Sequence, residues 1–155
     1  MTRDEVARAI ELAFAHATMP QTEDELAPLS IEAPYAIEHF FGKTRDAVES
    51  ASFPASLYME DFSYMTDAAV MYYVPSVLRI MLADPTDDEL WIYLHGFLRH
   101  INAEYPYPGL RALDAAQRNA IADWAEHLRG EWASNDWMRR FDGEAASLAR
   151  TYRAR

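Results

Sequence analysis

The feature that most constrains the fold is a helix-capping pattern that occurs three times, at residues 2–5, 86–89 and 114–117. Each pattern pairs a Thr or Asp with a Glu or Gln three residues later, and the two side chains satisfy backbone N–H groups at a helix start. Apolar residues at helical spacing follow each pattern. We therefore expect helices that run from these starts to about residues 17, 101 and 129, the last ended by Gly130.

Weaker patterns predict the remaining elements. Thr66 caps an apolar helix over residues 67–82, which we expect to be central and kinked near Pro75, because proline removes one backbone donor. Shorter helices are expected over 34–41, 44–51 and 144–152, with a proline-containing loop over 18–34 and either a short strand or a connector over 57–62. The sequence thus predicts an all-α fold, in which one domain over residues 1–155 contains about six to seven helices.

Several classes of chemistry lack the residues they need. The chain has no cysteine, which excludes disulfides, thiolate metal ligands and cysteine nucleophiles. It contains neither a glycine-rich phosphate loop nor a G-x-S-x-G nucleophile turn. No apolar run reaches the roughly 18 residues that span a bilayer, and the first residues lack the apolar core of a signal peptide. We expect a cytoplasmic protein without a cofactor and without a membrane partner.

The charge is negative and unevenly distributed. The net charge is -11, and residues 1–65 carry 4 Lys or Arg against 12 Asp or Glu, whereas residues 110–155 carry 8 against 7. An acidic surface repels phosphate backbones, so we expect no nucleic-acid partner. A basic protein partner fits this charge, although solubility alone is a sufficient reason for it.

The histidines show no metal-ligand spacing. His95 and His100 lie five residues apart, which places them about 140° apart around a helix. Glu38-His39 has no second histidine three to five residues away. We therefore expect no metal site, and the other two histidines, His16 and His127, are isolated as well.

Glu60 and Asp61 are the carboxylates with the most interesting placement. Acid–base hydrolysis needs two carboxylates, but the acidic run at residues 87–89 is explained by favourable charge in a first helical turn. Glu60 and Asp61 instead follow Met59 on a connector. With His95 and His100 they form the candidate catalytic set, and capping or solvation is the alternative role.

Exposed tyrosines suggest a contact surface. Tyr105 and Tyr107 alternate with prolines in a predicted loop, and tyrosine offers a large rigid contact area with a polar tip. Together with Tyr64, Glu60 and Asp61 they define the predicted acidic and aromatic binding surface. The alternative is that these rings cover the core.

Three segments resemble a family of small, acidic, helical bacterial proteins of unknown function. They are the Phe-x-Gly-Lys turn at residues 40–43, the Thr-x-x-Ala-x-x-Tyr-Tyr-x-Pro pattern at residues 66–75, and the stretch Leu-Asp-Ala-Ala-Gln-Arg-Asn-Ala-Ile at residues 113–121; an Ala-Phe-rich first helix, here Ala13-Phe14, also matches. Where the family places a tryptophan after the turn, this chain has Arg45-Asp46. The resemblance implies a helical fold and assigns no functional residue.

Three functions follow as hypotheses. The leading one is a protein-binding module that uses the acidic and aromatic surface, such as an immunity-type protein that neutralises a toxin or another basic effector. The second is a small helical hydrolase that uses the carboxylate and histidine candidates. The third is an oligomerising structural domain; the sequence leaves the oligomeric state undetermined.

Overall fold

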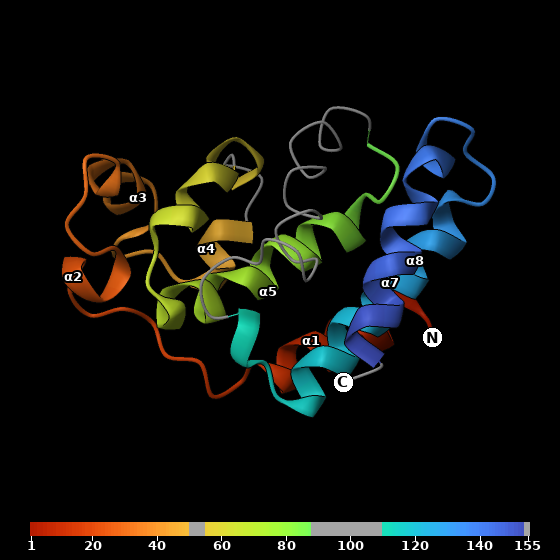
Figure 1. Cartoon of the computed structure of the whole chain (residues 1–155), viewed down its shortest axis with the longest axis horizontal. Coiled ribbons are helices and arrows are strands. Elements are labelled where there is room, and N and C mark those ends of the chain that lie inside the picture. The colour runs from red at the N-terminus through yellow and green to blue at the C-terminus, as the bar shows by residue number, and fades with distance from the viewer. Residues whose placement is uncertain (50–54, 88–109, 154–155) are drawn as a thin grey trace.

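The computed structural model describes residues 1–49, 55–87 and 110–153, and every element in these ranges is helical (Figure 1). The all-α prediction is therefore confirmed. Seven α-helices and three short 3-10 helices follow one another along the described chain: α1 (Arg3–Ala13), α2 (Glu23–Leu26), α3 (Ala33–Phe40), α4 (Arg45–Glu49), η1 (Ala55–Tyr64), α5 (Asp67–Ala83), η2 (Leu110–Ala112), α7 (Ala115–Trp132), η3 (Met138–Phe141) and α8 (Asp142–Arg153).

The helix α5 crosses the middle of the molecule and joins its two ends (Figure 1). At one end α7 pairs with α8, and α1 packs against α7. At the other end α3 packs on η1, α2 packs on α3 and α5, and α4 packs on α5. The start of α5 is tied to α2, because the Thr66 hydroxyl donates to the Glu25 carbonyl at 2.6 Å and the Thr66 N–H donates to the Leu26 carbonyl at 2.9 Å. The Thr66 cap, which the sequence predicts, therefore also connects α5 to α2 in the tertiary structure.

Three helix starts form as predicted. The Thr2 and Asp114 side chains each accept a hydrogen bond from the backbone N–H three residues later, and the Glu5 and Gln117 side chains accept in return from the Thr2 and Asp114 N–H groups. Thr66 accepts from the Ala69 N–H. Pro75 lies inside α5, which is one continuous helix through it. The third capping pattern, at residues 86–89, and the helix expected after it fall largely outside the described residues.

The sequence placed several helix boundaries wrongly. The first helix ends at Ala13, because Phe14 leaves the helical region and its carbonyl accepts instead from Ala17 and from the Arg45 guanidinium at 3.2 Å. The expected stop at Gly130 is also wrong, since α7 continues to Trp132. The indole of Trp132 is fully buried and donates to the Pro85 carbonyl at 2.7 Å, which outweighs the roughly 1 kcal/mol helix penalty of glycine.

Two connectors differ from the expected pattern as well. The loop over residues 18–34 contains the short helix α2, whose Thr22 cap accepts from the Glu25 N–H. The alternating segment at residues 57–62 is part of the 3-10 helix η1 and forms no strand. Helix α8 begins at Asp142, two residues earlier than the 144–152 prediction.

Candidate partner-binding surface

Helix α3 has one buried face and one outward face. Ala33, Ala36 and Phe40 recur at intervals of three and four residues and are buried. The other face carries Tyr35 and Glu38, both exposed. Pro34 stands in the first turn, where its missing N–H costs no helical hydrogen bond. The amphipathic pattern of α3 therefore fixes which of its side chains meet solvent.

Three large apolar side chains lie exposed on and just before α3. Leu29 is 97% exposed, Ile31 88% and Tyr35 60%. A single exposed apolar residue is ordinary, but three within seven residues are unusual, and exposed apolar side chains that gather in one region often mark a contact site. We call Leu29, Ile31 and Tyr35, with the carboxylates Glu32 and Glu38 among and after them, the acidic-apolar surface.

The charge around this surface is mostly negative. Residues 18–42 contain five carboxylates and neither Lys nor Arg, and the next residue, Lys43, directs its ammonium at backbone carbonyls of α3. Within the described ranges, these nearby carboxylates make no ion pair with an Arg, Lys or His: Glu23, Asp24, Glu32, Glu38 and Glu60. Uncompensated charges keep a long-range field, which opposite charges on a partner can meet.

Tyr73 on α5 anchors the end of α3. Its buried hydroxyl lies 3.0 Å from the Phe40 carbonyl and 2.7 Å from the Lys43 carbonyl, and burial raises the pKa of this phenol well above its usual value. The Lys43 ammonium donates to the carbonyls of Glu38 and His39, which are among the last of the helix. Gly42 takes a positive φ of 77°, a conformation that favours glycine, so the chain can turn there.

A histidine–carboxylate pair joins α3 to η1. The His39 Nδ1 atom lies 2.6 Å from the Asp61 Oδ2 atom, and the His39 ring stacks on Tyr58 with centroids 3.6 Å apart and planes 11° from parallel. Asp61 is only 7% exposed. Burial raises the pKa of the Asp61 carboxyl, the hydrogen bond to His39 acts in the opposite direction, and burial dominates.

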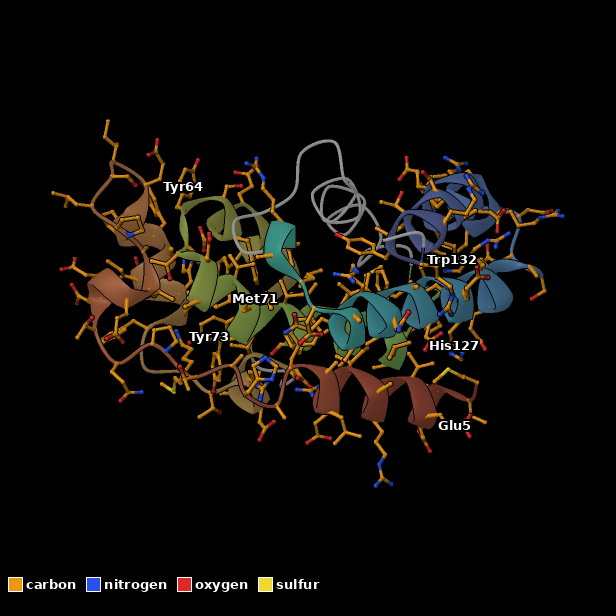
Figure 2. The ribbon with its side chains drawn as sticks, turned by 60° about the horizontal axis from the view of Figure 1, so that its bottom comes forward. Glu5, Tyr64, Met71, Tyr73, His127 and Trp132 are labelled. Carbon is orange, nitrogen blue, oxygen red and sulfur yellow. The ribbon has the colours of Figure 1, made fainter. Side chains whose placement is uncertain are left out.

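The structure describes three of the residues predicted to form the site, Glu60, Asp61 and Tyr64, and they differ in exposure. Glu60 is exposed and Tyr64 half-buried; Figure 2 shows Tyr64 at the same end of the molecule as α3. Asp61 is buried against His39, so it holds α3 in place and lies beneath the acidic-apolar surface rather than on it. His95, His100, Tyr105 and Tyr107 lie outside the described residues, so their part in a site stays a prediction.

Sequence reasoning missed two features of this region. His39 was set aside because it has no metal spacing, and its partner Asp61 stands 22 residues away with no local signal to connect them. The acidic-apolar surface was missed because leucine and isoleucine, here Leu29 and Ile31, usually pack into a protein core. Their position in a segment with three prolines and many carboxylates was the one available hint.

The described chain contains neither a metal-ligand cluster nor a membrane-spanning helix. No three His, Asp or Glu side chains there are arranged to hold a metal ion. Within the same ranges, no helix has the length and apolar character needed to cross a bilayer.

The chain was compared with protein-family models, with curated proteins and with solved structures, and none of the three comparisons finds a match.

Proposed function

We propose that this protein is a binding module that captures a basic protein partner on its acidic-apolar surface. The observation that carries the proposal is the coincidence of Leu29, Ile31 and Tyr35 in solvent with a segment, residues 18–42, of five carboxylates and no Lys or Arg. Exposed Glu60 on η1, next to the Asp61 that contacts α3, extends the same charge.

The two kinds of side chain on this surface, carboxylates and apolar groups, have different roles in recognition. The carboxylates attract a basic partner over a Debye length of about 10 Å and accelerate encounter. The apolar side chains then lose water on contact, which supplies affinity at about 25 cal/mol per Å² of apolar area buried. Because Tyr73, Lys43 and the His39–Asp61 pair hold α3 in place, little ordering is needed on binding.

Synthetic peptides test this proposal directly. A labelled peptide that combines Arg and Leu should bind the protein in a fluorescence anisotropy titration, and binding should weaken as salt rises. A peptide of the same length with Glu in place of each Arg should not bind. Equal binding of the two peptides would contradict the proposal, because it would show that charge does not select the partner.

A surface variant locates the contact. Replacing Leu29, Ile31 and Tyr35 together by Ser removes the apolar anchors and should weaken binding of the Arg-Leu peptide by about tenfold or more. Leu12→Ser is the matched control, since Leu12 is an exposed leucine on α1, away from the surface. If the control loses as much affinity as the triple variant, the contact lies elsewhere.

The His39–Asp61 pair favours a second candidate function, acid–base catalysis. A buried carboxylate bound to Nδ1 orients an imidazole so that Nε2 can take a proton, as in hydrolytic triads. Within the described residues Nε2 makes no hydrogen bond. A panel of activated esters tests it: the wild type should hydrolyse one of them faster than His39→Asn, and equal rates would remove this candidate.

A further inference from the structure

A second candidate site lies at the end of the molecule opposite to α3. A cleft of about 730 Å³ opens between the start of α1, the C-terminal half of α7 and the end of α8. This volume is in the range of small-molecule sites, about 300–1,000 Å³. The charged and titratable side chains that line it are Arg3, Asp123, Glu126, His127, Glu131 and Arg153.

The side chains of α7 converge on the cleft through helical spacing. Asp123, His127 and Glu131 recur every four residues, which places them on one side of the helix. Figure 2 places His127 between α7 and the start of α1. The His127 side chain is only 11% exposed, although it makes no hydrogen bond among the described residues. A nearly buried imidazole without a partner is a polar group that a ligand can satisfy.

Ion pairs inside the protein already occupy some of these charges. Arg153 pairs with Asp123, and Arg129 pairs with Glu126 at 3.1 Å. The His127 Nε2 atom is 3.9 Å from the Glu131 carboxylate, which is too far for a hydrogen bond.

The guanidinium of Arg3 is similarly uncommitted. It stands 3.9 Å from the carboxylate of Asp4, and both side chains are exposed. Among the charged and titratable side chains that line the cleft, those that remain for a ligand are therefore the carboxylate of Glu131, the imidazole of His127 and the guanidinium of Arg3.

We propose that this cleft binds a small zwitterion, of amino-acid or dipeptide size, that carries one ammonium and one carboxylate group. The ammonium donates to the Glu131 carboxylate and to the open nitrogen of His127. The ligand carboxylate accepts from the Arg3 guanidinium, whose planar donors suit a carboxylate. A ligand with a single charge meets only one of Glu131 and Arg3 and forgoes one charge-assisted hydrogen bond, so a ligand with both charges binds more tightly.

Calorimetric titration with the twenty common amino acids and with glycylglycine and leucylleucine tests the proposal. At least one of these probes should bind. Its N-acetylated and its C-amidated forms, each lacking one charge, should bind about tenfold more weakly or worse, since each loses a charge-assisted hydrogen bond. If none of the probes binds, or if the blocked forms bind as well as the free one, the proposal is wrong.

Two variants assign the contacts. Glu131→Gln and Arg3→Gln should each weaken binding of the best probe by about tenfold, and both proteins should fold because these side chains are exposed. Glu11→Gln and Arg8→Gln are matched controls, because both residues are exposed on α1 and neither lines the cleft. Loss of binding in the controls equal to that in the two variants would overturn the assignment. The Arg-Leu peptide result is independent of this outcome, because the acidic-apolar surface is at the other end.

Discussion

The two ends of the molecule differ in whether their carboxylates form ion pairs with cationic side chains. At the α7–α8 end arginines lie against carboxylates: Arg129 meets Asp142 at 2.8 Å, and Arg153 meets Asp123. On the acidic-apolar surface Glu32 and Glu38 make no ion pair with an Arg, Lys or His side chain in the described ranges. Carboxylates therefore link helices through ion pairs at the α7–α8 end, whereas those of the acidic-apolar surface remain available to a partner.

Exposed aromatic side chains differ between the two ends in the same way. Trp137 is 41% exposed, but the guanidinium of Arg140 covers its ring at 3.5 Å from the centroid. Leu29, Ile31 and Tyr35 have no such cover in the described structure. The difference teaches that exposure alone is a weak sign of a contact site, whereas exposure without a local partner is a stronger one.

The largest expected effect tests whether the α7–α8 end carries the core. Trp124 is fully buried on α7, and its indole donates to the Leu78 carbonyl of α5 at 2.9 Å. Trp124→Ala should lower the free energy of unfolding by about 3–5 kcal/mol in urea titrations, because it leaves a cavity and removes a buried hydrogen bond. Trp137→Ala is the control, and a smaller loss for Trp124→Ala than for this exposed tryptophan would contradict the assignment.

A moderate effect is expected where α5 holds the α3 end. Tyr73→Phe removes the hydroxyl that reaches the Phe40 and Lys43 carbonyls, and should lower the free energy of unfolding by about 0.5–1.5 kcal/mol. Tyr35→Phe, which changes an exposed hydroxyl, should leave it unchanged. If both variants are neutral in urea titrations, other contacts fix the end of α3.

A smaller effect is expected for a surface ion pair at the α7–α8 end. Arg153→Gln breaks the pair with Asp123, and because both side chains are partly exposed the loss should be about 0.2–1 kcal/mol. Thermal unfolding at low and high salt measures it, and the difference from the wild type should shrink as salt screens the pair. A difference that grows with salt would show that the arginine contributes mainly through packing.

The smallest effect is a change in pH dependence at the α3 end. Burial raises the pKa of Asp61, so the folded state holds this proton more tightly than the unfolded chain does. The Asp61 contribution to the free energy of unfolding is thus present below the ordinary Asp pKa of about 3.9 and is lost as the pH rises through the raised value.

Asp61→Asn removes this titration. Relative to the wild type, the variant should therefore gain stability as the pH rises from about 3.9, in urea titrations at several pH values. Asp24→Asn is the control, because Asp24 is exposed and has no ion pair in the described residues. A variant whose stability relative to the wild type falls over the same pH window would show that the bond to His39 outweighs burial.

Much of the local structure was readable from the sequence. The caps at Thr2, Thr66 and Asp114 each depend on a side chain and a backbone N–H three residues apart, so the helix starts follow from short-range geometry. The buried face of α3 follows from spacing in the same way. Of the predicted site, the sequence singled out Glu60 and Asp61, and it did not foresee that Asp61 would be buried while Glu60 stays exposed.

What the sequence by itself determined is the all-α class and the places where helices begin. The tertiary structure alone decided where α1 and α7 end, because Arg45 competes for the Phe14 carbonyl and burial of Trp132 carries the helix past Gly130. It alone brought His39 to Asp61. The physical reason is range: a cap forms between neighbours in the chain, whereas these contacts join residues that only the packed fold brings together.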